Sequence, residues 1–265
     1  MTVSVSLGPR LLTVASFVPD GAKLGDIGTD HAYLPIYLYE TKRIIKAIGV
    51  DVHEGPYQSA LSAVRSRWLE AVIDVRFGDG LKPLKPGEVD ALTLAGMGGK
   101  TMLEILFARM DVLEAVSELV VQPQGAEGAV RLALLEHGWR LRTERLIEEE
   151  GRIYVVMAYS KTEGWNAAEL QNKEQEWVQR LRSTATEVQV PEDEFLPLVH
   201  HLVWNFGPLV LEERSMDLER LLLDYSLLLS KRMDQMKKAK RIEITSKIKS
   251  ISFEKALVEG LRRWR

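Results

Sequence analysis

A regular alternation of short apolar runs with amphipathic segments, from residue 22 to about 160, most constrains what this chain can fold into. Such an alternation is typical of a parallel sheet covered by helices. The apolar runs predict strands at Ala22–Ile27, Ile44–Asp51, Val72–Gly78, Val89–Ala95 and Leu119–Gln122. The segments between them predict helices at Tyr33–Thr41, Pro56–Leu69, Lys100–Met110 and Ala126–His137. Five consecutive βα units are therefore expected.

The alternation of strand and helix patterns ends after the fifth unit. Trp139–Ile147 and Ile153–Ser160 are two further strand patterns separated only by EEEGR, which predicts an antiparallel hairpin with a Gly-containing turn. Five parallel strands that end in such a pair match the seven-stranded class I methyltransferase sheet better than the six-stranded NAD-binding sheet. The predicted fold class is therefore α/β, Rossmann-like and seven-stranded.

Helical patterns replace the strands after Lys161, which predicts a sheet domain over 1–162 and an all-helical, coiled-coil-like domain over 163–265. One seam of three- and four-residue steps joins Leu218, Leu222, Tyr225, Leu229 and Met236, with Arg232 as its one charged interruption. A similar register on Trp165–Gln189 joins Leu170, Trp177, Leu181 and Val188, and a connecting segment is expected from Pro191 to Pro208. We expect an antiparallel helical hairpin, and its role stays open between stabilisation and dimerisation. A monomer is the first expectation for the chain.

Charge is distributed unevenly along the chain. Residues 231–265 contain twelve Lys/Arg and four Asp/Glu, a net charge of +8, whereas residues 1–230 carry −11. A basic helical end can bind RNA because neutralised phosphates release counterions, but it can equally be a solvated helix face. The candidate RNA-binding cations there are Lys231, Arg232, Lys237, Lys238, Lys240 and Arg241.

The chain contains no cysteine, which excludes disulfides, thiolate nucleophiles and Cys-based metal sites. No metal site is predicted. No apolar run approaches the ~18 residues that a membrane-spanning helix needs, so no membrane partner is expected. The absence of cysteine favours a cytoplasmic location. The N-terminal stretch lacks a basic leader, a long apolar core and a small-residue cleavage site, so it is expected to be mature sequence.

The loop after the first predicted strand reads Asp26-Ile-Gly-Thr-Asp-His31, at the edge where doubly wound sheets bind ligands. An NAD site needs GxGxxG, but this loop has Gly28 followed by Asp30 where the second glycine would stand. A carboxylate there repels a pyrophosphate and attracts a sulfonium or ammonium, so Asp26 and Asp30 favour S-adenosyl-L-methionine (SAM) as cofactor. Asp30 could instead, or in addition, cap the following helix.

Three later strand ends extend this pattern along the same edge. Asp51 follows the second strand at the spacing where a carboxylate accepts ribose hydroxyls. Asp79 and Gly80 follow the third strand and are placed to receive an adenine, although GDG alone is a turn sequence. The fourth strand ends in LAGMGG, where Ala95 and Gly96 are further cofactor candidates and the small residues leave room for a planar base. A permissive turn before a helix is the alternative.

Four residues near this edge are candidates for positioning a substrate base, and none is assigned as a general base: His31, Tyr33, Met97 and Gln122. The rings of His31 and Tyr33 could stack on a base or hydrogen-bond to it. The Gln122 amide could read a base edge, although Gln122-Pro123 could also simply end the strand.

These motifs together resemble a known family, the bacterial tRNA (adenine-N1) methyltransferases of the TrmK type. The likeness rests on LGPRLLTVASFVP at 7–19, DIGTDHAYLP at 26–35, VDVHEGPY at 50–57, FGDGL at 77–81 and LAGMGG at 94–99. It implies methylation of N1 of adenine 22 in tRNA, with SAM as cofactor and tRNA as partner. It also implies that Asp26, Gly28 and Asp30 line the methionine end, Asp51 the ribose, and Asp79 and Gly80 the adenine. Arg10 would lie near the RNA.

The Asn/Asp-Pro-Pro-Tyr motif of enzymes that methylate an exocyclic amine is absent. Adenine N1 carries an available lone pair, so its methylation needs orientation more than a base. Two other functions stay open: a SAM-dependent methyltransferase acting on another RNA position, a small molecule or a protein, and a non-catalytic RNA-binding or interaction protein of the same fold. An NAD oxidoreductase fits poorly because the glycine pattern is wrong.

Overall fold

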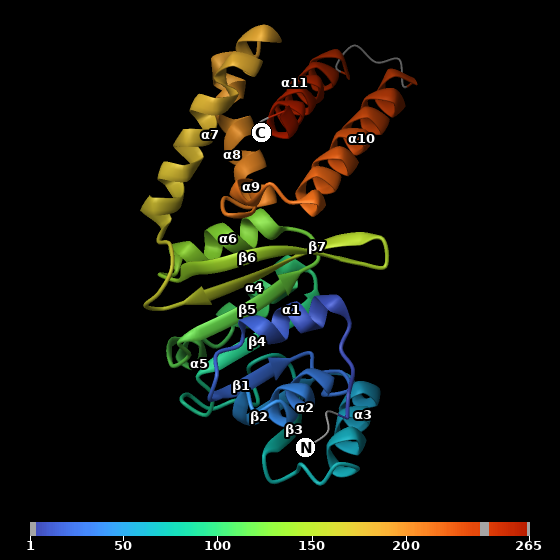
Figure 1. Ribbon diagram of the computed structural model, residues 1–265, viewed down its shortest axis with the longest axis vertical. Helices are drawn as coiled ribbons and strands as arrows, with labels where there is room; N and C mark the ends of the chain where they lie inside the picture. Colours follow the sequence, from blue (N-terminus) through green and yellow to red (C-terminus); the bar gives the residue numbers. More distant parts are fainter. Residues whose placement is uncertain (1–3, 239–243, 264–265) are drawn as a thin grey trace. The chain divides into compact units, whose positions relative to one another are not determined.

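The computed structural model describes residues 4–238 and 244–263 of the chain. The chain folds as two compact units, Met1–Asn166 and Ala167–Arg265, which Figure 1 shows from the blue N-terminus to the red C-terminus. Within the described ranges, every helix is too short or too polar to cross a lipid bilayer.

The first unit is built on a seven-stranded sheet with the strand order β3-β2-β1-β4-β5-β7-β6. The strands are β1 (Ala22–Ile27), β2 (Ile44–Asp51), β3 (Ile73–Phe77), β4 (Ala91–Met97), β5 (Glu118–Pro123), β6 (Arg140–Glu149) and β7 (Arg152–Ser160). Strands β1 to β5 pair in parallel, and β7 pairs antiparallel with both β5 and β6. The strand order changes direction at β1, between β2 and β4. The Rossmann-like, seven-stranded class predicted from the sequence is confirmed.

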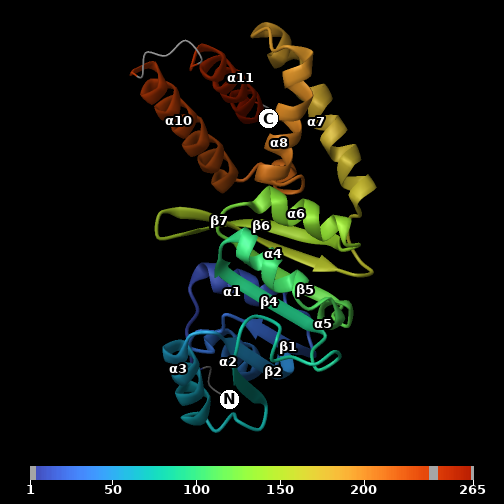
Figure 2. The same cartoon turned by 180° about the vertical axis from the view of Figure 1, so that it is seen from behind.

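Helices cover both faces of this sheet, as Figures 1 and 2 show from opposite sides. They are α1 (Pro9–Phe17), α2 (Tyr33–Glu40) and α3 (Glu54–Arg65) on one face, and α4 (Gly99–Phe107), α5 (Met110–Glu114) and α6 (Glu127–Glu136) on the other. Residues 91–94 of β4 are fully covered, because a central parallel strand is packed on both sides. Parallel strands fed by these helices bring all their carboxyl ends to one edge.

Helix α1 was not anticipated from the sequence. It begins at Pro9, whose fixed φ suits the first helical position, where a missing N–H breaks no hydrogen bond. Its buried side chains include Val14 and Phe17, and it packs against β6 and β7 as well as β5. The helix therefore carries residues near position 10 to the sheet edge where β4 and β5 end.

The predicted hairpin between β6 and β7 is present, but its loop is shorter than expected. Glu149 pairs with Arg152, which leaves a two-residue loop of Glu150 and Gly151. Both loop residues have positive φ, 52° and 79°, as a type I′ turn requires. This turn matches the right-handed twist of the two strands, and it allows β6 to extend to Glu149.

The second unit is entirely helical over its described residues. Its helices are α7 (Ala167–Glu187), α8 (Glu192–Phe206), α9 (Val210–Glu213), α10 (Met216–Lys238) and α11 (Ile244–Arg263). Helix α10 packs along α11, and α11 also contacts α7 and α8. The expectation of a two-helix hairpin with a connecting segment over 191–208 is wrong, because most of that segment forms α8. The acidic first turn of α8, Glu192 to Glu194, suits the positive end of a helix dipole.

The predicted seams are only partly buried. Leu218, Leu222 and Leu229 lie in the core of this unit, and Arg232, the charged interruption of the seam, is exposed. Val188 was predicted in the core and is 39% exposed, so that prediction is wrong. The reason is that α7 ends at Glu187.

Candidate active site

Asp26 lies near the carboxyl end of β1 and is 5% exposed. Its carboxylate accepts hydrogen bonds from Thr93 Oγ1 at 2.6 Å and from Thr29 Oγ1 at 2.7 Å. Burial raises the pKa of Asp26, because poorly solvated surroundings disfavour the charged carboxylate, and the two hydroxyl groups partly oppose that rise. A cation placed beside this carboxylate would be stabilised, because the surroundings screen the attraction weakly.

Asp51 ends the neighbouring strand β2 and is also buried. Its carboxylate accepts hydrogen bonds from the backbone N–H of Asp30 at 3.1 Å and from that of His53 at 3.0 Å. The negative charge of Asp51 contributes to the raised pKa of Asp26. Two buried carboxylates therefore interact at the point where the strand order changes direction.

The Asp30 side chain does not cap the following helix. Residue Ala32 occupies the N-cap of α2, with no side-chain hydrogen bond to the helix. Asp30 itself has a φ of 51°, and its carboxylate forms an ion pair with His31 Nδ1 at 2.9 Å. The capping interpretation is therefore wrong, and the carboxylate stays exposed beside the loop.

Two glycines allow side chains to approach the backbone around these carboxylates. Gly28 has a φ of +75°, and a Cβ at this position would lie 3.2 Å from Met97 Cε. Gly96 has a φ of +79°, and its Cβ would lie 3.7 Å from Arg10 Nη1. Met97 thus reaches back over the first loop, and Arg10 packs beside Gly96 near the end of β4.

Gln122 is fully buried at the end of β5. Its Oε1 accepts hydrogen bonds from the Gly96 backbone N–H at 3.0 Å and from Arg10 Nη1 at 2.8 Å, and its Nε2 donates to the Pro123 carbonyl at 2.9 Å. These contacts occupy the amide inside the protein. The interpretation of Gln122 as a reader of a base edge is therefore corrected: it joins α1 to the end of β4.

Arg10 is held from a second side by Glu149 of β6. Arg10 Nε lies 3.0 Å from Glu149 Oε2, and the Arg10 backbone N–H donates to Glu149 Oε1 at 3.1 Å. The guanidinium also lies over the Tyr154 ring, 5.6 Å from its centroid. The family resemblance implied that Arg10 lies near the RNA; in the structure Arg10 lies beside Gly96 and is held by Gln122 and Glu149.

A cavity of about 340 Å³ joins these groups at the carboxyl edge of the sheet. Residues that line it include Arg10, Asp26, Gly28, Asp30, Ala95 and Gly96. His31 and Tyr33 also border the cavity, with ring centroids 5.2 Å apart and both side chains exposed. The folded chain therefore gathers predicted cofactor residues, two of the base-positioning candidates and the cation of α1 around one space.

Asp79 and Gly80 lie farther along the same edge, after β3, and do not line that cavity. Asp79 is exposed and forms an ion pair with Lys82 at 2.7 Å. Gly80 is buried with a φ of +57°, and a Cβ there would lie 2.8 Å from Ile105 Cγ2. Because β2 separates β3 from β1, a ligand that spans from Asp26 to Asp79 must be extended along the edge.

Gly99 provides a test of how tightly the start of α4, directly after β4, is packed. A Cβ at Gly99 would lie 2.5 Å from the Gly125 carbonyl oxygen, so an alanine must displace the start of α4 or the loop after β5. We expect Gly99→Ala to destabilise the protein by about 1–3 kcal/mol, as overpacking does, and to lower activity by moving the Gly96 loop. Urea denaturation and a turnover assay would measure both. Gly55→Ala, in α3 with no atom within 4 Å of the added Cβ, is the control and should be neutral or stabilising.

The predicted RNA-binding cations belong to the second unit. Lys231, Arg232 and Lys237 are exposed on α10, and Lys237 forms an ion pair with Asp234 at 3.6 Å. Lys240, Arg241 and the side chain of Lys238 lie outside the described residues. The three described cations form a solvent-accessible basic stretch on one helix.

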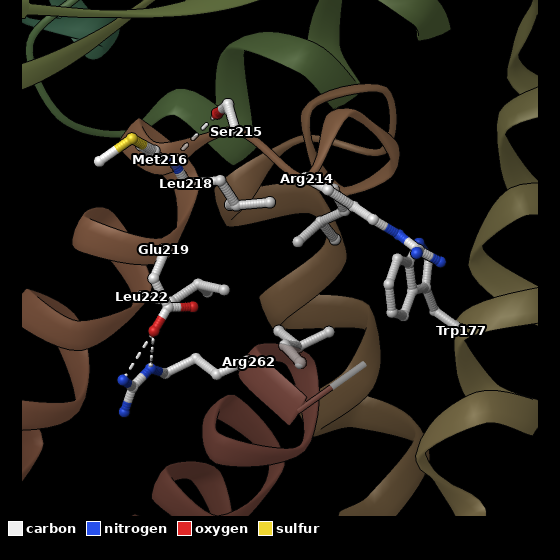
Figure 3. A pocket seen from close by; sticks show the side chains of 10 residues that line it. Trp177, Arg214, Ser215, Met216, Leu218, Glu219, Leu222 and Arg262 are labelled. Atoms are coloured by element: carbon white, nitrogen blue, oxygen red, sulfur yellow. Dashed lines mark hydrogen bonds and ion pairs between the residues drawn. The ribbon is translucent and has the colours of Figure 1, made fainter. Parts of the chain in front are cut away.

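A separate cavity of about 360 Å³ lies inside the helical unit (Figure 3). Its apolar lining comes from Trp177, Leu218, Leu222 and Leu261. At its side, Arg262 and Glu219 form an ion pair at 2.7 Å, marked in Figure 3. None of the site residues predicted from the sequence lines this cavity.

Sequence reasoning missed three residues of the candidate site: Thr29, Thr93 and Glu149. Thr93 carried a signal, because a hydroxyl within the apolar run ALTLAG of a central strand must find a hydrogen-bond partner. Thr29 lies within the loop already singled out. Glu149 carried no local signal, because its role depends on pairing with a residue 139 positions away.

The geometry agrees with what comparisons with known proteins show. A family model described as a methyltransferase domain matches residues 7–157. The chain belongs to this methyltransferase family. A curated relative, the tRNA (adenine(22)-N(1))-methyltransferase of Bacillus subtilis (strain 168), is 40% identical over 153 residues, which are 58% of this chain and 64% of the relative.

Solved structures extend the likeness over the helical unit. The crystal structure of the B. subtilis M1A22 tRNA methyltransferase TrmK matches with a TM-score of 0.78 at 27% identity, covering 98% of this methyltransferase and 100% of that chain. A Streptococcus pneumoniae structure in complex with S-adenosyl-L-methionine matches with a TM-score of 0.68 at 30% identity, covering 94% and 99% of the two chains. The resemblance to the TrmK type stated from the motifs is confirmed.

Proposed function

We propose that this methyltransferase transfers a methyl group from SAM to N1 of adenine 22 in tRNA. The observation that carries the proposal is the buried carboxylate of Asp26, which interacts with the buried Asp51 and lines a cavity together with Ala95 and Gly96 near the end of β4. The B. subtilis relative named for this activity supports the choice of substrate.

The residues present fit SAM. Asp26 is a buried carboxylate whose hydrogen bonds come from two neutral hydroxyls, so a cationic ligand would compensate its charge. Asp26, Gly28 and Asp30 would hold the methionine end together with Ala95 and Gly96, which line the same cavity, and Asp51 would accept ribose hydroxyls. Asp79 and Gly80 would lie at the adenine. When bound, SAM supplies an electrophilic methyl group on a positively charged sulfur.

The chain's own contribution to the reaction is orientation. N1 of a neutral adenine has a free lone pair, so no residue has to remove a proton before attack, and positioning supplies most of the rate. His31 and Tyr33 border the cavity with exposed rings that can stack on a base. The Met97 side chain lies against Gly28 and narrows the space through which the base approaches the cofactor. Since N1 takes part in base pairing, adenine 22 must leave its stack to enter.

The direct test is to incubate the full chain with isotope-labelled SAM and unmodified tRNA, and to identify the methylated nucleoside and its position by mass spectrometry. N1-methyladenosine at position 22 is expected. Another methylated nucleoside, or the same one at another position, would refute the specific substrate, and transfer to no RNA would refute the tRNA proposal.

The exposed cations of α10 are proposed to contact the tRNA. Reversing Lys231, Arg232 and Lys237 to Glu should weaken tRNA binding by at least about tenfold at low salt, because each lost phosphate contact removes counterion release. SAM affinity should not change. Filter binding over a range of salt concentrations would measure the loss together with a shallower salt dependence.

The control for these reversals is the pair Lys46→Glu and Lys85→Glu, which changes exposed cations of the sheet unit. Neither residue lies near the cavity or on the predicted RNA-binding helix. Equal tRNA affinity of the α10 variant and the unmodified protein would make the basic stretch a solvated helix face.

A further inference from the structure

The cavity at the carboxyl edge has an uneven distribution of charge. Asp26 lies near the end of β1 and Asp30 in the loop that follows it, whereas Arg10 lies beside Gly96 near the end of β4. Among the described residues that line the cavity, Arg10 is the one Lys or Arg. The arrangement presents anionic groups and a cationic group to the same ligand.

The hydrogen bonds described for the Arg10 guanidinium use only some of its N–H donors. Arg carries five N–H donors, and the hydrogen bonds described for this side chain use Nε–H toward Glu149 and one N–H of Nη1 toward Gln122. The contacts described for the Arg10 side chain are with Glu149, Gln122 and the Tyr154 ring, and none of them is with Asp26 or Asp30.

Two residues hold Arg10 in position before any ligand arrives. Gln122 is 0% exposed and binds both Arg10 Nη1 and the Gly96 N–H through the same oxygen. Glu149 binds the Nε and the backbone N–H of Arg10. A guanidinium fixed in this way loses little conformational freedom when it binds an anion, and its planar fork suits a carboxylate.

The methionine end of SAM carries one carboxylate beside one ammonium. Burying that carboxylate without a donor is unfavourable, and Asp26 and Asp30 can serve only the cationic groups. We propose that Arg10 binds the carboxylate of the cofactor's amino-acid end, and that Gln122 and Glu149 are positioning residues that aim it. This inference rests on the proposed use of SAM, and it moves Arg10 from the RNA to the cofactor.

Decarboxylated SAM tests the proposal, because it lacks only the carboxylate. Calorimetry should show that the unmodified full chain binds SAM about 10- to 100-fold more tightly than decarboxylated SAM, as expected for one charged hydrogen-bonded pair. Arg10→Ala should lose that preference by weakening SAM binding alone. Gln122→Leu should lose part of it, and Arg109→Ala, at a half-buried arginine paired with Asp111 and outside the cavity lining, should keep it.

Arg10→Lys is a control for a folding defect in the alanine variant. It keeps the positive charge but loses the planar guanidinium, so it should retain only part of the preference for SAM over decarboxylated SAM. Equal binding of the two ligands by the unmodified chain would overturn the proposal. Equal weakening of both ligands in Arg10→Ala, or unchanged SAM binding with a raised KM for tRNA, would overturn it as well. Failure of the unmodified chain to bind SAM would instead refute the proposed function.

Discussion

Replacing Asp26 with Asn is expected to weaken SAM binding by about 30- to 1,000-fold, the loss typical when one partner of a buried, hydrogen-bonded charge pair is neutralised. Asn preserves the volume of the side chain, and its carbonyl can still accept a hydrogen bond from Thr93 or Thr29. The expected loss therefore reports the missing negative charge. Isothermal calorimetry with SAM measures it directly.

S-adenosylhomocysteine distinguishes the contributions of the cofactor's two positive charges to binding, because it lacks the sulfonium but keeps the ammonium. If Asp26 serves the ammonium, Asp26→Asn should weaken both ligands by the same factor. Asp74→Asn, an exposed carboxylate of β3 paired with Arg76, should change neither affinity. Unchanged SAM binding by Asp26→Asn would show that the buried carboxylate is structural, and it would remove the main support for the site.

The second large effect concerns stability. Arg131 of α6 and Glu144 of β6 form an ion pair at 2.7 Å, with both side chains fully buried. Glu144→Gln should destabilise the first unit by about 3–5 kcal/mol, because it leaves an uncompensated charge in the interior. A urea titration followed by circular dichroism would show a lower midpoint for the transition that SAM stabilises.

A double variant distinguishes two contributions to the free energy of unfolding: the loss caused by removing one charge of the pair, and the stabilisation that the intact pair provides. Arg131→Met combined with Glu144→Leu removes both charges and fills the space with apolar atoms, so it should recover most of the stability lost in Glu144→Gln. Arg109→Ala breaks an exposed pair with Asp111 and should shift the midpoint little. A double variant less stable than Glu144→Gln would mean that the pair itself stabilises the fold.

The strands were predictable because each is a local pattern. β1 and β2 have the bounds expected from the sequence, and the other strands differ from expectation by at most two residues at either end. Helices α1 and α8 were not predicted from the sequence. Helix α1 is short, and α8 follows Pro191 and contains Pro197. Proline disfavours a helix interior, but tertiary packing of an apolar face outweighs that local preference.

The loop carboxylates were also predictable, because the carboxyl ends of parallel strands meet at one edge. Asp26 and Asp51 could be chosen from strand ends and spacing alone. Gln122 shows the limit of this reasoning: its position was right, but its amide is consumed by contacts with Gly96 and Arg10. Which hydrogen bonds a side chain makes depends on neighbours that strand spacing does not specify.

The sequence by itself determined the order of the strands, the class of the sheet and the carboxylates at its edge, because periodicity and strand ends are properties of neighbouring residues. Only the tertiary structure decided where Arg10 acts. Its partners Gln122 and Glu149 lie 112 and 139 positions away, on β5 and β6. Contacts between residues so far apart in the chain depend on how α1 packs across the sheet, and no local sequence pattern predicts that packing.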